Sequence, residues 1–391
     1  MTLTGDQSLL KRLNTSALLR LVKGEAGISR AELAKRTGLT KSTVSLLVQE
    51  LLEEGWLCER IATVSGSVGR RPTPLQLDPS RLAMLGAEIG VDYLNVVCCN
   101  LQGEVLASRL QAFQHRDLTD SLAALAALLA QQHAALRLQG RRALGLGVGI
   151  PGTVDAAGRR LGFVPNLDWH DQEVHAQLLA ALELQQVPAM PVTVLNEANA
   201  AALSEYVFGT AQRAAPLVYL SVGIGLGGGI VIDDRLYLGH DGSAGEVGHT
   251  ILELDGPPCA CGRRGCAETF VSQRAVSVAV MGAGAPILGI SELEMRLQSG
   301  DPPVLAAVQR AGRYLGLLMQ NLCNTVDPAS IVLGGPLCQL GAPFIDAATA
   351  SLRALEGRFD FHSTTVRQCR LGIDACAIGA AGAVLLHALR D

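Results

Sequence analysis

The N-terminal part of the chain carries apolar residues at helical spacing. Four of them occur at positions i, i+3, i+4 and i+7, which line one face of a helix: Val44, Leu47, Val48 and Leu51. Thr40 precedes this stripe and can cap the helix, while Ser29 and Glu32 form a capping box that begins a shorter helix before it. The shorter helix is predicted to end at Gly38, and a further helix is predicted upstream through residues 18–22.

A short helix, a glycine turn and a second helix form a helix-turn-helix pattern. The N-terminus and polar face of the second helix offer hydroxyl and ammonium groups to DNA phosphates and base edges: Thr40, Lys41, Ser42, Thr43 and Ser45. After this helix, residues 56–57 and 74–77 predict a two-stranded β-wing with Arg70 and Arg71 at its tip. Guanidinium groups at this tip can enter a narrow minor groove. We therefore expect a winged helix-turn-helix domain over residues 1–80. A helical protein-interaction module with a solvated arginine turn is the alternative.

From residue 81 onwards the pattern of apolar residues along the chain changes. Short apolar runs that end in glycine turns alternate with Ala- and Leu-rich helices such as residues 121–138, a pattern typical of an α/β fold. Residues 85–89, residues 92–99 and a segment after the next glycine turn predict three consecutive strands. A second set of strand-like segments joined by glycines covers residues 217–232. It suggests that the chain contains two duplicated lobes that close on a cleft. Its glycines could bring backbone N–H groups close to a phosphate, although a glycine-rich hairpin alone is a weak signal.

Length and charge add two constraints. A chain of 391 residues exceeds one ordinary hydrophobic core, and with 49% apolar and 17% charged residues it is expected to fold into two or three domains. The net charge of -4 is unevenly distributed, because residues 1–80 contain 11 Lys and Arg against 8 Asp and Glu, whereas the rest contains 21 against 28. A basic head on an acidic body fits a DNA-binding domain joined to a sensor, although so small an excess is also typical of an ordinary solvated surface.

The 10 cysteines do not indicate disulfides, because the sequence shows no leader peptide and no apolar run of transmembrane length. We therefore expect a reducing cytoplasm and no membrane association. One histidine and three clustered cysteines match the tetrahedral ligand set of a structural Zn²⁺: His249, Cys259, Cys261 and Cys266. The alternative is three buried thiols and an unrelated histidine. Glu246 and Glu268 flank this knuckle (residues 245–268) and could face one cleft.

The knuckle reads Gly-Glu-x-Gly-His and then Cys-x-Cys-Gly-x-x-Gly-Cys-x-Glu. This pattern resembles the signature of the ROK family of repressors, open reading frames and sugar kinases. Supporting motifs lie at residues 149–155, 165–169, 196–202 and 327–335. The resemblance implies an α+β multidomain chain in which the winged head precedes an α/β domain of two actin-like (ribonuclease H-like) lobes that bind a sugar between them.

The resemblance also implies domain limits and site residues. The sugar-binding domain would cover residues 81–391, with lobe 1 at about 81–195 plus a C-terminal helix at about 376–391, and lobe 2 at about 196–375. The implied zinc ligands are the four knuckle residues. The implied sugar contacts are Asn166, Asn196, Glu197, Glu246, His249 and Glu268. Carboxylates and amides can pair with vicinal hydroxyls, and a histidine that binds zinc through one nitrogen can offer the other to the sugar.

Departures from the family's kinase pattern argue against an enzyme. A kinase needs an aspartate base for the attacked sugar hydroxyl and a first-lobe Asp-x-Gly-Gly-Thr turn that holds phosphates. Here the base position holds Glu197, and the turn at residues 88–92 lacks both the glycine pair and the hydroxyl. Val222 also stands near where the second turn would have a threonine. We therefore expect no catalytic residues, with a weak sugar kinase as the alternative.

The preferred interpretation is a sugar-responsive transcriptional repressor of carbohydrate-metabolism genes. Asn-Glu-Ala-Asn at residues 196–199 resembles xylose-responsive members of the family, which makes a pentose such as xylose the first candidate effector and glucose or another hexose the next. One winged head reads only a few base pairs, so a homodimer, or a tetramer, on a palindromic operator DNA is expected. A structural interaction module that uses the helical head is a third class of function.

Overall fold

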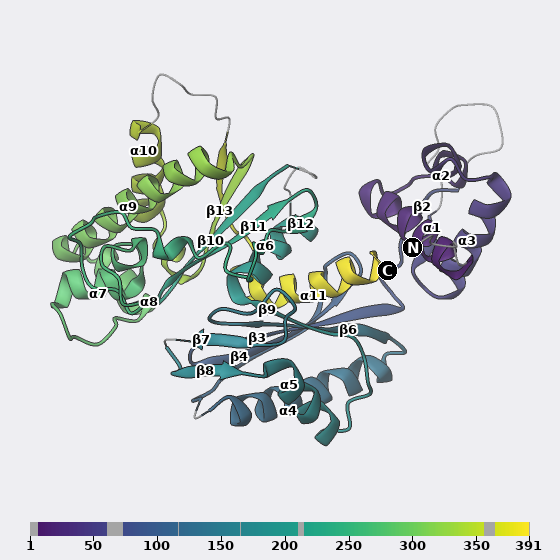
Figure 1. The fold of residues 1–391 in the computed structure, drawn as a ribbon, viewed down its shortest axis with the longest axis horizontal. Coiled ribbons are helices and arrows are strands. Elements are labelled where there is room, and N and C mark those ends of the chain that lie inside the picture. Colours follow the sequence, from purple (N-terminus) through teal and green to yellow (C-terminus); the bar gives the residue numbers. More distant parts are fainter. Residues whose placement is uncertain are drawn as a thin grey trace.

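The computed structural model describes residues 7–60, 73–115, 117–164, 166–209, 215–355 and 364–390. Figure 1 shows a small N-terminal domain, the head, beside two larger α/β lobes. No helix within these residues combines the length and the apolar character needed to cross a membrane. The predicted fold class, a winged helix-turn-helix followed by two lobes with mixed sheets, is confirmed.

The head contains α1 (Gln7–Gly24), α2 (Arg30–Thr37), α3 (Lys41–Glu53), β1 (Leu57–Glu59) and β2 (Leu75–Leu77). As predicted, the Ser29 hydroxyl accepts a hydrogen bond from the Glu32 N–H at the start of α2, and Gly38 ends this helix with a φ of 72°. Thr40 caps α3 in the same way, and the four residues of the predicted apolar stripe are buried. Strands β1 and β2 pair antiparallel and form the base of the wing. The predicted tip, with Arg70 and Arg71, lies outside the described residues.

Lobe 1 is built on a sheet with the strand order β5-β4-β3-β6-β9. Its strands are β3 (Leu82–Ile89), β4 (Tyr93–Asn100), β5 (Val105–Ala112), β6 (Arg142–Ile150) and β9 (Val192–Asn196). The first three are antiparallel neighbours, whereas β6 is parallel to β3 and β9 is parallel to β6. Helices α4 (Leu118–Leu138) and α5 (Val174–Leu184) pack together at this sheet, and a hairpin of β7 (Leu161–Val164) and β8 (Trp169–Gln172) follows β6. The three consecutive strands predicted from the sequence are present.

Lobe 2 repeats this topology with the strand order β12-β11-β10-β13-β14 and the same antiparallel and parallel pairs. Its strands are β10 (Leu217–Val222), β11 (Leu226–Ile232), β12 (Arg235–Leu236), β13 (Ser330–Gly334) and β14 (Thr365–Gln368). Its α-helices are α7 (Gln273–Met281), α8 (Ile290–Gln298), α9 (Pro302–Val326) and α10 (Ala342–Leu355). Short 3-10 helices are η1 (Val247–His249), η2 (Ala267–Thr269), η3 (Pro336–Leu340) and η4 (Gly372–Asp374). The matching sheets confirm the duplicated lobes.

Two helices, α6 (Glu197–Val207) and α11 (Ala375–Ala388), lie between the two sheets (Figure 1). Helix α11 packs on β3 and β6, α6 packs on β10 and β11, and the two helices pack against each other. Small residues let them come close: a Cβ on Gly147 would lie 1.9 Å from the Ala380 carbonyl oxygen, and one on Gly379 would lie 1.7 Å from the Ala200 carbonyl oxygen. Larger side chains in this α6/α11 layer would therefore force the lobes apart.

The three glycines at residues 227–229 belong to strand β11, and their backbone pairs with β10. A Cβ on Gly229 would lie 2.5 Å from the Ala198 carbonyl oxygen, and one on Gly228 would lie 3.0 Å from the carbonyl oxygen of Gly245. These glycines therefore let α6 and the start of the knuckle approach the sheet. In the structure these glycines allow close packing, and phosphate binding by this hairpin stays a weak indication from the sequence.

Candidate effector and metal site

The knuckle is a compact loop that joins η1 to η2. The Cys259 N–H donates to the Arg263 carbonyl oxygen at 2.8 Å, and an isolated bridge pairs Ile251 with Cys266. Gly265 has a φ of 68°, and a Cβ there would lie 1.5 Å from a backbone oxygen of Glu253. The sequence thus folds the cysteines back towards His249, because a glycine occupies the position where the chain reverses most tightly.

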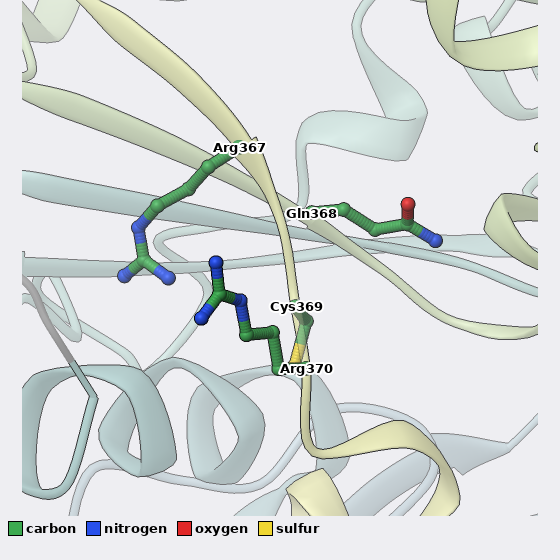
Figure 2. Close-up of a pocket in the computed structure, with 4 residues that line it drawn as sticks. All are labelled: Arg367, Gln368, Cys369 and Arg370. Carbon is green, nitrogen blue, oxygen red and sulfur yellow. The ribbon is translucent and has the colours of Figure 1, made fainter. Parts of the chain in front are cut away.

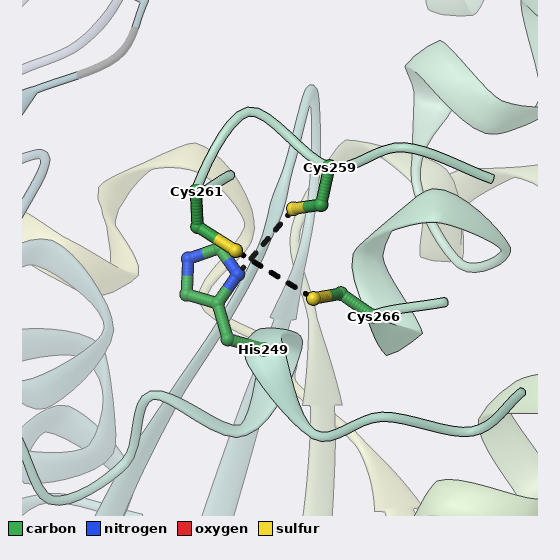
Figure 3. A group of neighbouring side chains, drawn as sticks. All are labelled: His249, Cys259, Cys261 and Cys266. Atoms are coloured by element: carbon green, nitrogen blue, oxygen red, sulfur yellow. Dashed lines mark hydrogen bonds between the residues drawn. The ribbon is translucent and has the colours of Figure 1, made fainter. Parts of the chain in front are cut away.

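The four predicted metal ligands converge (Figure 3). Their donor atoms all lie within 4.8 Å of one another. The Cys259 Sγ lies 3.6 Å from the Nδ1 of His249, and the Cys261 Sγ lies 3.6 Å from the Sγ of Cys266. Ligands on a tetrahedron with Zn–S bonds of about 2.3 Å are separated by roughly 3.8 Å, so this arrangement fits a tetrahedral metal ion. The described residues therefore contain a cluster able to hold a metal.

The imidazole of His249 connects this cluster to Glu246. Its Nδ1 faces Cys259, and its Nε2 lies 3.9 Å from the Oε2 of Glu246. A metal bound at Nδ1 would leave the proton on Nε2, which then acts as a donor. One ring can therefore hold the metal and also present an N–H beside a carboxylate.

Three of the predicted sugar-binding carboxylates form one charged group with His249. Burial, and then the nearby charge of Glu246, raises the pKa of Glu197 to about 7. Burial also raises the pKa of Glu246, a shift that a charged His249 opposes and Glu268 increases. The Glu268 carboxylate is fixed because its Oε2 accepts the N–H of Leu226 at 3.1 Å. The structure thus brings Glu197, Glu246, His249 and Glu268 together.

The two predicted asparagines lie in different environments. The Oδ1 of Asn196 accepts the N–H groups of Ala198 and Asn199, and its Nδ2 donates to the Gly152 carbonyl oxygen at 2.9 Å. Its amide therefore caps α6, and a sugar contact from Asn196 stays a prediction. The Oδ1 of Asn166, from lobe 1, accepts a hydrogen bond at 3.1 Å from Arg274 at the start of α7. Asn166 thus contacts lobe 2 through Arg274, which follows Glu268 by six residues in the chain.

The first-lobe turn is closed by an aromatic residue, Tyr93, that was not among the predicted site residues. The Gly90 N–H donates to the Tyr93 carbonyl oxygen at 2.9 Å, and a Cβ on Gly90 would lie 2.3 Å from the Tyr93 ring. The Tyr93 hydroxyl donates to the Oε1 of Glu88 at 2.7 Å, while the buried Oε2 of Glu88 has no hydrogen-bond partner. Burial, and then the charge of Glu197, raises the pKa of Glu88 to about 8. The only sequence signal was a tyrosine directly after this turn.

The predicted DNA-binding residues of the head lie at the N-terminus of α3. The Thr40 hydroxyl contacts the hydroxyls of Ser42 and Thr43, at 2.9 Å and 2.8 Å, and Lys41 and Ser45 are exposed. Two other basic residues of the head are paired with carboxylates, because Arg30 binds Glu59 and Arg36 binds Glu25. A DNA contact from the α3 N-terminus stays a prediction.

A winged helix-turn-helix domain followed by two actin-like lobes and a Cys/His knuckle defines the architecture of this chain. The chain belongs to the ROK family, whose model matches residues 84–386, and a winged helix-turn-helix DNA-binding model matches residues 12–57. The resemblance of the knuckle sequence to the ROK family is therefore confirmed.

Relatives that match nearly the whole chain are transcriptional regulators. The chain is 30% identical over 387 residues to the xylose repressor of Bacillus subtilis, with 98% of each chain covered. A ROK family transcriptional regulator, a homolog of the Escherichia coli Mlc protein, superposes with a TM-score of 0.79 at 25% identity, covering 98% of this chain and 100% of that one.

A ROK family glucokinase from Streptomyces griseus, solved with glucose and AMPPNP, matches less of the chain. It has a TM-score of 0.64 at 27% identity, and the match covers 76% of this chain and 98% of the kinase. The complete kinase therefore corresponds to only part of this chain. The two full-length matches above are to regulators and not to kinases, in agreement with the expectation that the chain is not an enzyme.

Proposed function

We propose that the protein is a sugar-responsive transcriptional repressor of carbohydrate-metabolism genes. The observation that carries the proposal is the full-length similarity to a xylose repressor, which includes the winged head. The exposed hydroxyl and ammonium groups at the start of α3 support DNA binding by this head. The closed turn at Gly90 argues against the kinase alternative, because its N–H is used within the hairpin and the Tyr93 ring fills the space beside it.

The proposed effector is a monosaccharide bound between the lobes, with xylose as the first candidate and glucose as the next. The carboxylates of Glu197, Glu246 and Glu268 can accept hydrogen bonds from vicinal hydroxyls, and the Nε2 of His249 can donate one. Asn166 on the opposite lobe could complete the site when the cleft closes, because it lies beside Arg274 of lobe 2. The name of the Bacillus relative supports xylose.

The proposed metal is a structural Zn²⁺ held by His249 and the three knuckle cysteines. Four protein ligands complete a tetrahedral shell, so no position would remain open for a reacting water. Zinc would fix the loop that positions Glu246, Glu268 and the His249 ring. Metal binding and sugar binding would therefore be coupled through one side chain.

Helix α6 offers a direct connection from the sugar site to the head. It begins at Glu197 and ends at Val207, whose carbonyl oxygen accepts a hydrogen bond at 3.3 Å from the Nζ of Lys23 on α1. A helix of 11 residues spans about 16 Å and moves as a rigid body. A sugar that pulls on the start of α6 would therefore shift the surface against which the head rests.

We further propose a homodimer, with a tetramer as a possible further assembly, that reads palindromic operator DNA. Two heads on two half-sites bind more tightly and more specifically than one. The domain limits proposed are residues 1–80 for the head and 81–391 for the sugar-binding domain, and the proposed location is the cytoplasm, where DNA and free monosaccharides meet.

The test uses full-length protein and DNA fragments that it selects from a random library. Fluorescence anisotropy should give a sequence-specific complex that one monosaccharide from a panel weakens by about 5- to 150-fold. Lys41→Ala should reduce DNA affinity, whereas Lys11→Ala, which removes a charge elsewhere on the head, should leave it nearly unchanged. Sugar-dependent ADP production without sequence-specific DNA binding would overturn the proposal.

A further inference from the structure

A pocket of about 280 Å³ lies along the end of the edge strand β14, on lobe 2. Among the described residues, four consecutive ones line it: Arg367, Gln368, Cys369 and Arg370 (Figure 2). None of the predicted sugar-binding or metal-binding residues contributes to it. The pocket is therefore separate from the site described above.

Arg367 carries a buried hydrogen-bond donor that the described protein atoms do not satisfy. Its Nη1 pairs at 2.5 Å with the Oε2 of Glu205, whose side chain is only 3% exposed. Its Nη2 is buried and has no hydrogen-bond partner. An unsatisfied buried donor costs about 1–3 kcal/mol, and more when it is charged, so the described protein atoms compensate the charge of this guanidinium only in part.

Arg370 adds a second guanidinium to the same pocket. Its side chain is exposed and makes no hydrogen bond or ion pair with the described part of the chain. Figure 2 shows both arginine side chains extending to the same side of the strand, whereas Gln368 extends to the other side, where its Nε2 donates to the Cys338 carbonyl oxygen at 3.0 Å. Within the residues that the structure describes here, two positive charges therefore meet one buried carboxylate, which leaves an excess of one positive charge.

We propose that this pocket binds the phosphate group of a small anion. Guanidinium groups present planar forks of N–H donors that match the oxygens of phosphate, and two forks can contact different oxygens of one tetrahedral group. The pairing with Glu205 fixes the guanidinium plane of Arg367, and the 26% of this side chain that is exposed lines the pocket. The volume lies close to the lower end of small-molecule sites, about 300–1,000 Å³, so a small organic group beside the phosphate also fits. The proposal does not depend on the proposed function.

The experiment is isothermal titration calorimetry of the full-length protein with inorganic phosphate at constant ionic strength. Wild-type protein should show saturable binding with one phosphate per chain. Arg370→Ala should weaken this binding at least tenfold, and Arg367→Lys, which keeps the charge that pairs with Glu205 but loses the fork, should weaken it as well. Arg353→Ala removes an exposed charge from α10 of the same lobe and should bind like the wild type.

Glycerol 3-phosphate and glycerol provide the second arm of the experiment. Tighter binding of the ester than of inorganic phosphate would identify a phosphorylated metabolite as the ligand class, and the reverse order would identify the free ion. Glycerol without phosphate should give no saturable heat. The proposal is overturned if wild-type protein shows no saturable binding of either phosphate, or if Arg370→Ala binds both as the wild type does.

Discussion

The buried Glu88 should make lobe 1 less stable as the pH rises from 6 to 8. The residue is only 6% exposed, Tyr93 donates to one carboxylate oxygen, and the other oxygen has no partner among the described residues. Burial raises the pKa of Glu88 from its ordinary value of 4.5 to about 8. Between these two values the folded chain keeps a proton that the unfolded chain has lost, so the free energy of unfolding falls as the pH rises.

The size of the effect follows from these two pKa values. A full proton difference changes the free energy of unfolding by about 1.4 kcal/mol per pH unit. Integrated from pH 6 to pH 8, where folded Glu88 begins to ionise, the loss due to Glu88 is roughly 2 kcal/mol. Glu197 adds a loss of the same sign of roughly 1 kcal/mol, because its pKa is raised to about 7.

The assay is urea unfolding monitored by tryptophan fluorescence in a Trp56→Phe background. The chain has 2 tryptophans, so this background leaves Trp169 of lobe 1 as the reporter. Glu88→Gln, which imitates the protonated acid, should remove most of the dependence on pH. Glu183→Gln, which changes an exposed carboxyl on α5, should retain it. A wild-type stability that stays flat between pH 6 and pH 8, or a full slope in Glu88→Gln, would show that Glu88 does not keep its proton in the folded chain.

Three further predictions concern the knuckle, the effector and its connection to the head. Cys261→Ser should lose the one zinc ion per chain expected by elemental analysis, whereas Cys369→Ser should retain it; a native protein without zinc would contradict the assignment. Glu246→Ala should abolish the sugar response in the anisotropy assay while DNA binding survives, and a normal response would show that the cleft residues are wrongly assigned. Lys23→Met removes the donor to Val207 at the end of α6, a bond worth about 1.5–3 kcal/mol for a charged donor. It should reduce the effect of sugar on DNA affinity by about fivefold or more while sugar affinity changes little; unaltered coupling would exclude this route.

Local features of the sequence predicted the head and the knuckle well. The apolar stripe of α3, its Thr40 cap and the Gly38 stop are all interactions between residues close in the chain. The four metal ligands likewise fall within 18 residues, so their spacing alone indicates convergence. Such short-range patterns are readable without knowledge of the fold.

Residues whose role depends on distant parts of the chain were harder to interpret. The glycines of β11 are needed because α6 approaches them, and nothing near them in the sequence indicates that helix. Asn196 is the first residue of a motif that suggests sugar binding, yet its amide is engaged by the start of α6 and by Gly152. Arg367 of β14 pairs with Glu205 of α6, two elements that are far apart in the chain. No local sequence pattern therefore indicates the pocket at β14.

The close approach of α6 to α11 has a consequence for how the lobes can move. Long side chains at a helix contact interlock, and sliding one helix past the other then requires them to change rotamer. Where Gly379 of α11 meets Ala200 of α6, the contact has no such interlocking side chains. The lobes can therefore slide in small steps along a smooth surface, in the manner of a shear motion, without unpacking a core. A modest difference in contacts with one small ligand is then enough to choose between two lobe positions.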